Sequence, residues 1–315
     1  MAFLENCWIA VCLVYEMAAL PVKLNAMSHP TRRTLALSDG NISYLTWSGN
    51  GPALHFAHAT GFNAETYAPL LTPLSDRMRI LASDARGHGF TALPTVPGSA
   101  RGWKIFRRDL VQFLDATVRE PVVLAGHSMG AIVSAMIAAR WPERVTGLIL
   151  LEPVFVPGLL HLVRWIPYRP PGVDLASRAE RRRATFPSFE AARASYLGRG
   201  AFRTWPQEFL NAYLSGGLVP DGDGVRLACA PAWEAQVFRS TPFGAARLAR
   251  RIKCPVTLMY AEQSTPPESE CQAFARRHGN TRLIKVPGTT HFLPMERPDL
   301  VQEEVLRFAQ PLGKG

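Results

Sequence analysis

Short apolar runs alternate with helical patterns along much of the chain. Residues 122–125 are fully apolar, a small-residue helical pattern follows at 131–139, and residues 145–151 are apolar again. The alternation returns near the C-terminus, where a strand-like run at 256–260 precedes a helical pattern at 268–277. Strands that are apolar on both faces are typical of a parallel sheet covered by helices on both sides. The pattern therefore predicts the α/β class with a mostly parallel central sheet.

Further elements of the same kind flank this centre. Alternating residues around the turn signal Asp39-Gly40-Asn41 predict two paired strands, and Asn63 is placed to cap the helix that follows it. The remaining expected elements are strands at 33–38, 42–47, 53–57, 78–82 and 282–286 and helices at 67–74, 107–118 and 300–308.

Residues 154–245 have a different pattern. They are rich in proline, arginine and aromatic side chains, with helical stretches and no strand alternation. We expect them to form a helical lid inserted into a sheet domain made of residues 28–153 and 246–315. Residues 1–27 precede the sheet pattern, and their apolar stretch is too short for a membrane span and lacks the basic start of an export signal. They are predicted to be an N-terminal extension.

Composition excludes several classes of protein. With 47% apolar and 19% charged residues among 315, the chain is typical of a globular protein with a sizeable core. Five cysteines without a C-x-x-C pair indicate neither a disulfide framework nor a zinc site, and they favour a cytoplasmic location. The formal charge of +10 is not accompanied by a nucleic-acid-binding motif or a basic tail. We expect no nucleic-acid partner and attribute the arginines of residues 164–203 to solvated helix faces.

A candidate nucleophile lies at a junction of predicted elements. The sequence Gly126-His127-Ser128-Met129-Gly130 separates a predicted strand from a predicted helix. A G-x-S-x-G pattern at such a junction places serine on a strained turn, where glycines avoid clashes with the neighbouring strand and helix. The helix start directs backbone N–H groups and positive potential at the same point. Ser128 is the predicted nucleophile.

Four motifs in one order resemble the α/β-hydrolase superfamily, over about residues 33–153 and 254–308. These motifs are His58-Ala59-Thr60-Gly61-Phe62, Asp84-Ala85-Arg86-Gly87-His88-Gly89, the Gly126–Gly130 segment and Thr290-His291-Phe292. The resemblance implies the α/β-hydrolase fold and the serine-nucleophile, lidded, esterase-like branch of the superfamily. A serine needs a base to attack a carbonyl group at neutral pH, and His291 is expected to be that base.

The resemblance also implies an oxyanion hole made of backbone N–H groups. Met129, the residue after the nucleophile, would supply one group. The second would come from the loop after the third strand, where either Thr60 or Phe62 can be the donor. We expect His58 to shape this loop through hydrogen bonds and His88 to stabilise its own turn.

The acid of the triad departs from the family's pattern. Ser264 stands where the family usually has aspartate, and we expect it to take no part in charge stabilisation. Glu152 ends the sixth strand, and because parallel strands lie about 4.8 Å apart, its side chain can reach His291. Glu152 is therefore the favoured acid, with Glu262 as the alternative.

Together these residues predict a carboxylesterase-like serine hydrolase that cleaves an ester or related acyl bond through an acyl-enzyme. It is expected to need no cofactor and no metal, and to act on a small apolar or aromatic acyl substrate. Two alternatives stay open: a cofactor-free perhydrolase that uses the same triad, and a non-catalytic protein that binds a small ligand in the same cleft. Most lid aromatics are expected to pack the lid and a few to face the substrate: Trp165, Tyr168, Phe186, Phe189, Tyr196, Phe202, Trp205, Phe209, Tyr213, Trp233 and Phe238.

Overall fold

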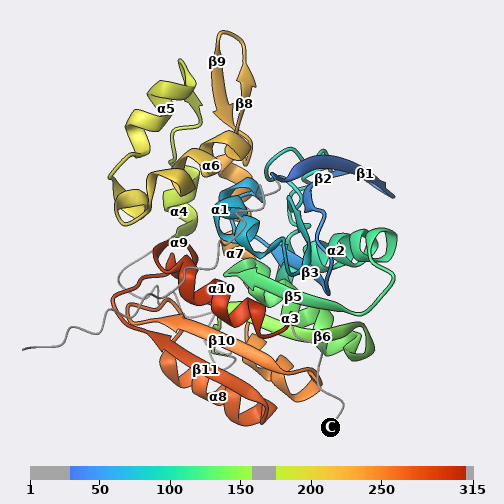
Figure 1. The fold of residues 1–315 in the computed structure, drawn as a ribbon. Coiled ribbons are helices and arrows are strands. Elements are labelled where there is room, and N and C mark those ends of the chain that lie inside the picture. Colours follow the sequence, from blue (N-terminus) through green and yellow to red (C-terminus); the bar gives the residue numbers. More distant parts are fainter. Residues whose placement is uncertain (1–28, 158–174, 310–315) are drawn as a thin grey trace, which may run out of the picture.

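The computed structural model describes residues 29–157 and 175–309. The expected N-terminal extension and two lid aromatics, Trp165 and Tyr168, lie outside these residues. Eight strands form one sheet in the order β1-β2-β4-β3-β5-β6-β10-β11 (Figure 1). Strand β2 runs antiparallel to its neighbours β1 and β4, and the other strand pairs are parallel. The predicted class, a mostly parallel α/β sheet, is confirmed.

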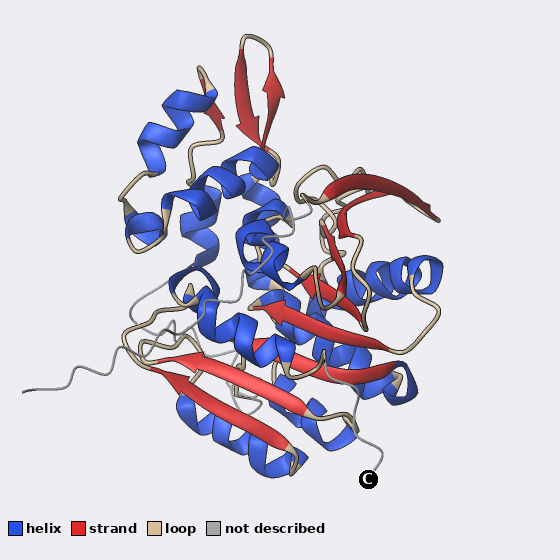
Figure 2. Cartoon of the chain, viewed as in Figure 1, coloured by secondary structure: helices blue, strands red, loops and turns tan. Residues whose placement is uncertain are grey.

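The elements carry the following bounds. The strands of the sheet are β1 (Thr31–Leu37), β2 (Gly40–Trp47), β3 (Ala53–Ala57), β4 (Arg79–Ser83), β5 (Val122–His127), β6 (Val145–Leu151), β10 (Val256–Ala261) and β11 (Thr281–Val286). The helices are α1 (Ala68–Leu71), α2 (Lys104–Thr117), α3 (Met129–Arg140), α4 (Leu175–Glu180), α5 (Phe189–Tyr196), α6 (Gln207–Gly217), α7 (Pro231–Arg239), α8 (Glu268–His278), α9 (Leu293–Glu296) and α10 (Pro298–Leu306). Figure 2 shows helices lying on both sides of the large sheet. None of the helices within the described residues is long and apolar enough to cross a membrane.

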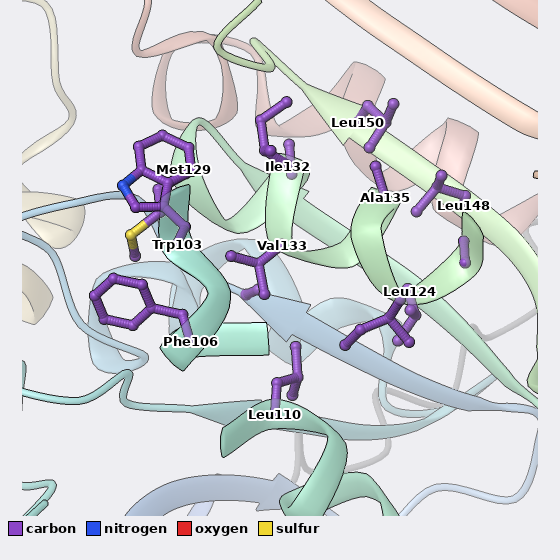
Figure 3. Packing of buried hydrophobic residues seen from close by; sticks show 14 of the residues in the cluster. Trp103, Phe106, Leu110, Leu124, Met129, Ile132, Val133, Ala135, Leu148 and Leu150 are labelled. Carbon is purple, nitrogen blue, oxygen red and sulfur yellow. The ribbon is translucent and has the colours of Figure 1, made fainter. Parts of the chain in front are cut away.

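Two apolar layers explain why the central strands are mostly apolar. Successive side chains of a strand point to opposite faces. Leu124 of β5 and Leu148 and Leu150 of β6 therefore pack against α2 and α3 (Figure 3). Their neighbours Ile149 and Leu151 join a second cluster with α1, α6 and α10 on the other face. Because both faces are buried, the strands are continuous apolar runs.

The segment expected at 67–74 to be one helix is a succession of short turns. It consists of η1 (Glu65–Tyr67), α1 and η2 (Thr72–Leu74). Asn63 caps its start as predicted, since its Oδ1 accepts from the Thr66 N–H at 3.0 Å. Prolines at the starts of α1 and η2 remove backbone N–H groups, which breaks the regular ladder.

Helices dominate the described part of the expected lid, but the prediction that it lacks strands is wrong. Strands β7 (Thr185–Phe186), β8 (Leu218–Asp221) and β9 (Gly224–Leu227) form a small antiparallel sheet. A two-residue turn joins β8 to β9, and Gly222 within it adopts φ +56°, a conformation that glycine accepts without strain. Figure 1 shows this hairpin beside α5 and α6 at one end of the molecule.

Candidate active site

Ser128 lies between β5 and α3 in a backbone conformation that side chains rarely adopt. Its φ is +56° and its ψ is −113°. Such strain at a non-glycine residue persists only where the surrounding structure enforces it, and it is common at functional sites. Here the Ser128 N–H donates to the Leu151 carbonyl at 3.0 Å, which ties the turn to the end of β6. The residue is 6% exposed, so it is buried beneath the surface of the molecule.

Both glycines of the motif stand where a side chain would clash with its neighbours, as the sequence predicted. A Cβ on Gly126 would lie 2.4 Å from the Gly130 carbonyl carbon, at the start of α3. A Cβ on Gly130 would lie 2.0 Å from the Ala57 carbonyl oxygen at the end of β3. Both distances are far inside contact range, so neither position accepts a side chain without movement of the backbone.

The sheet register brings the predicted base and acid together. His127 of β5 pairs with Leu151 of β6, so the residues that follow them, Ser128 and Glu152, leave the sheet side by side. Across the same edge, the Nδ1 of His291 lies 3.0 Å from the Glu152 Oε2. The carboxylate is fully buried, whereas the imidazole is 23% exposed. No hydrogen bond joins His291 to the Ser128 hydroxyl within the described structure, and such bonds often tighten only when substrate binds.

The Glu152 carboxylate is held by more than the histidine. Its Oε1 accepts from the Ala261 N–H at 2.6 Å and from the Ser264 hydroxyl at 2.7 Å, and its Oε2 also accepts from the Thr265 N–H at 3.1 Å. Glu152 has φ +47°, a second strained non-glycine conformation. The expectation that Ser264 stands apart from the charge is wrong, because Ser264 donates directly to this carboxylate.

Glu262, the alternative acid, points elsewhere. Its side chain is exposed, and its Oε2 accepts from the Gly288 N–H at 3.0 Å. Glu262 therefore holds the loop after β11, whereas Glu152 contacts His291.

The two candidate oxyanion donors in the loop after β3 differ in whether their N–H groups already have an acceptor. The N–H groups of Ala59 and Gly61 donate to buried side chains, and the Phe62 N–H donates to the Ala59 carbonyl at 3.1 Å. The Thr60 N–H has no acceptor among the described residues. Met129 begins α3, and the first N–H groups of a helix lack an acceptor within the helix.

Two buried histidines cross-link this loop to the turn after β4. The Nε2 of His58 accepts from the Ala85 N–H at 2.8 Å, and the Nε2 of His88 accepts from the Gly61 N–H at 3.1 Å. Each Nδ1 donates to a backbone carbonyl. Burial lowers the pKa of His58 to about 4 and that of His88 to about 3, so both rings are neutral. Both expected roles are confirmed, since His58 bonds the loop after β3 and His88 bonds its own turn, and each ring also bonds the other segment.

Aromatic rings from separate segments meet beside these loops. Phe62 packs against Trp205 and Tyr213 of the expected lid at ring separations of 5.5 and 5.6 Å. Trp205 also lies 5.5 Å from Phe292, the residue after His291. The indole N–H of Trp205 is buried and has no acceptor among the described residues. Phe202 and Tyr196 extend this group, since Phe202 lies 4.8 Å from Trp205 and Tyr196 lies 6.1 Å from Tyr213, whereas Trp233 packs elsewhere, against Phe106.

One residue of this region was missed by the sequence reasoning, because its arginine run was assigned to a solvated face. Arg182 is largely buried and donates to Glu234 at 2.6 Å and to the hydroxyls of Tyr196 and Tyr213 at 3.2 and 2.7 Å. Glu234 in turn packs against Gly61, where a Cβ would lie 2.3 Å from its Oε1. A triplet of arginines carries no signal that tells which one is buried.

Nothing in the described residues forms a group of three or more histidine, cysteine, aspartate or glutamate side chains able to hold a metal ion. Comparison with known proteins agrees with the fold. The chain belongs to the alpha/beta hydrolase family, whose model matches residues 56–304. The resemblance carried by the four motifs is confirmed, and the chain is thus a hydrolase of the α/β family.

Individual relatives are distant. Over 262 residues the chain is 25% identical to 2-(acetamidomethylene)succinate hydrolase of Mesorhizobium japonicum, covering 82% of this chain and 88% of that protein. The crystal structure of E-2-(acetamidomethylene)succinate hydrolase matches with a TM-score of 0.72 and 23% identity, over 89% of this chain and 99% of that one. The enol-lactonase from Burkholderia xenovorans matches with a TM-score of 0.65 and 18% identity, over 88% and 99% of the two chains. The two structural matches show a shared fold.

Proposed function

We propose that the protein is a serine hydrolase that cleaves a carboxylic ester or related acyl bond, with Ser128, His291 and Glu152 as its triad. The observation that carries this proposal is the 3.0 Å contact between His291 Nδ1 and a buried carboxylate, next to a serine in a strained turn. A carboxylate on Nδ1 holds the tautomer in which Nε2 is free to accept a proton. Strained backbone at both Ser128 and Glu152 supports the same reading.

The residues then act in a fixed sequence. Ser128 Oγ attacks the substrate carbonyl carbon while its proton passes to His291 Nε2, and Glu152 stabilises the imidazolium. The oxyanion of the tetrahedral intermediate accepts from the N–H groups of Met129 and Thr60. We choose Thr60 over Phe62 because the Phe62 N–H already donates to the loop. The proton then goes from Nε2 to the leaving group, and water repeats the steps on the acyl-enzyme.

The aromatic cluster supports an uncharged acyl substrate. Phe62, Trp205 and Phe292 flank the loops that carry the oxyanion donors and the base. The indole N–H of Trp205 has no acceptor among the described residues, and we propose that it donates to a substrate oxygen. Arg182, a largely buried cation next to the loop after β3, already has Glu234 as its counter-ion. For this reason the succinate of the Mesorhizobium relative's name is not carried over to this chain.

We assign Trp205 and Tyr213 of this aromatic cluster to a lid made of residues 154–245. Its described part supplies Trp205 and Tyr213 to the cluster around Phe62, which belongs to the sheet domain. The division into this lid and a core of residues 28–153 and 246–315 is part of the proposal, and these ring contacts support it by placing lid side chains against the core.

A fluorophosphonate probe and p-nitrophenyl esters of graded acyl length test the proposal together. We expect labelling of wild-type protein at Ser128 and hydrolysis of apolar or aryl esters. The Ser128→Ala variant should lose labelling and at least 99% of turnover, because removal of a triad serine typically costs on the order of 10⁶ in kcat. Absence of labelling in the folded wild type would favour the non-catalytic binder. Peracid formation that exceeds ester hydrolysis in the presence of peroxide would favour the perhydrolase.

A further inference from the structure

A chain of buried hydrogen bonds connects the loop after β3 to the loop that carries His291. The Ala59 N–H donates to the Tyr67 hydroxyl at 3.2 Å. That hydroxyl lies 2.7 Å from Nδ1 of His127, and Nε2 of the same ring lies 2.7 Å from the His291 carbonyl oxygen. Tyr67 and His127 are both fully buried. The chain therefore passes from one catalytic loop to the other through the residue that precedes Ser128.

The direction of each hydrogen bond follows from the chemistry of its two ends. A carbonyl oxygen can only accept, so Nε2 of His127 carries the hydrogen that goes to His291. Burial lowers the pKa of His127 well below its ordinary value, so the ring is neutral and its Nδ1 has a lone pair. The Tyr67 hydroxyl must then donate to Nδ1, and its oxygen accepts from the Ala59 N–H. Each donor in the chain has one acceptor, and one arrangement of hydrogens satisfies it.

We propose that Tyr67 and His127 are positioning residues that hold the oxyanion donor Thr60 and the base His291 in register with Ser128. Thr60 follows Ala59 directly, so an anchored Ala59 N–H restricts the backbone from which the Thr60 N–H projects, and the bonded Ala59 carbonyl orients their shared peptide group. The bond to the His291 carbonyl fixes the backbone from which the imidazole projects, independently of the Glu152 contact. The proposal rests on the function proposed above, since it assigns roles in that reaction.

Loss of this series of hydrogen bonds should lower kcat more than it changes KM. The affected groups meet the substrate's developing charge and proton in the transition state, and an error of about 1 Å in such groups costs about 100-fold in rate. Two replacements of His127 test the hydrogen bonds of its two ring nitrogens separately. Glutamine places an amide N–H where Nε2 lies and keeps the bond to His291, whereas asparagine reaches only the Nδ1 position.

We would titrate the active sites with the fluorophosphonate probe and divide the rate of ester hydrolysis by their concentration. Misfolded molecules then do not affect the value of kcat. The His127→Asn variant should lose about 10- to 100-fold in kcat with KM within about threefold, while His127→Gln should stay within about fivefold of wild type. The Tyr67→Phe variant keeps the ring and removes the central hydroxyl, and it should lose about tenfold. Tyr44→Phe removes a phenol hydroxyl from β2, away from both loops, and serves as the matched control.

A second readout does not depend on activity. In wild-type protein, ¹⁵N NMR of the His127 ring should show a protonated Nε2 and an unprotonated Nδ1. A hydrogen on Nδ1, or equal kcat for Tyr67→Phe, His127→Asn and the Tyr44→Phe control, would overturn the proposal and leave the hydrolase function standing. If wild-type protein is neither labelled nor active, the proposed function fails, and the positioning roles fail with it.

Discussion

Four buried histidines should make this protein unusually sensitive to mild acid. His55, His58, His88 and His127 are each at most 2% exposed. Burial lowers the pKa of His55 and His88 to about 3 and that of His58 to about 4, and it lowers the pKa of His127 well below its ordinary value. His58 and His88 also face each other at a ring separation of 5.1 Å, which disfavours charge on either. All four rings stay neutral in the fold at pH values where the unfolded chain binds protons.

The size of the effect follows from proton linkage. Below an unfolded pKa of about 6.5, each unfolded histidine binds a proton that the folded ring does not, so stability falls as the pH falls. Between pH 6.5 and 5.5 each histidine costs about 1 kcal/mol, and four cost about 4 kcal/mol. That is a large share of the roughly 5–15 kcal/mol that stabilises an ordinary domain. Carboxylates hardly titrate in this window, so histidines dominate it.

Urea unfolding at constant ionic strength, followed by tryptophan fluorescence at pH 6.5, 6.0 and 5.5, measures the loss. His55→Gln is the informative variant, because His55 bonds Ser83 through Nε2 at 2.9 Å and a glutamine amide can replace that nitrogen. The loss over the window should fall from about 4 to about 3 kcal/mol in this variant. A wild-type loss below about 1 kcal/mol would refute the reasoning, since most of the four rings would then accept protons without unfolding.

Three further predictions concern the site and its surroundings. Glu152→Gln should lower kcat for ester hydrolysis by about 10⁴, because an amide group facing Nδ1 favours the tautomer whose Nε2 cannot accept a proton. Glu262→Gln, which alters an exposed carboxylate, should stay within about twofold in the same assay, and equal losses would contradict the assignment of the acid. Gly130→Ala should lower the free energy of unfolding, measured in urea, by about 3 kcal/mol, because the added Cβ meets the Ala57 carbonyl. A loss under about 1 kcal/mol would show that the turn at Gly126–Gly130 can adapt to the side chain. Arg182→Met should lower the free energy of unfolding by about 3–5 kcal/mol, because it leaves the Glu234 carboxylate without its counter-ion. In the same urea assay, the double variant Arg182→Met, Glu234→Gln should regain more than half of the lost free energy.

Local pattern predicted the sheet because burial on both faces leaves a signal in every strand. Leu148, Ile149 and Leu150 alternate between the two core layers, and none of them tolerates a polar residue. The strained turn was equally visible, since the steric exclusion at Gly126 comes from Gly130, four residues further along; the exclusion at Gly130 comes from Ala57 on β3 and depends on the fold. Local rules of this kind predict what adjacent residues impose on one another.

Contacts between distant segments were not predictable in this way. Arg182 meets a carboxylate 52 residues further along the chain, and Tyr67 meets a histidine 60 residues away. No spacing rule connects such pairs before the fold is known. The β8–β9 hairpin is a different case, because Asp221-Gly222 is a local turn signal that the prediction of a helical lid did not take into account.

The meeting of Ser264 with the Glu152 carboxylate has an evolutionary consequence. The two side chains converge from neighbouring strand ends on one point, 2.7 Å apart. A carboxylate supplied from position 264 would enter the same set of donors, so the acid can change strands without any change in the sheet. An ancestor carrying both acids would have held two carboxylates that share one proton. Replacing either one with a hydroxyl would then have relieved the repulsion, so the transfer of the acid from one strand to the other need not pass through an inactive protein.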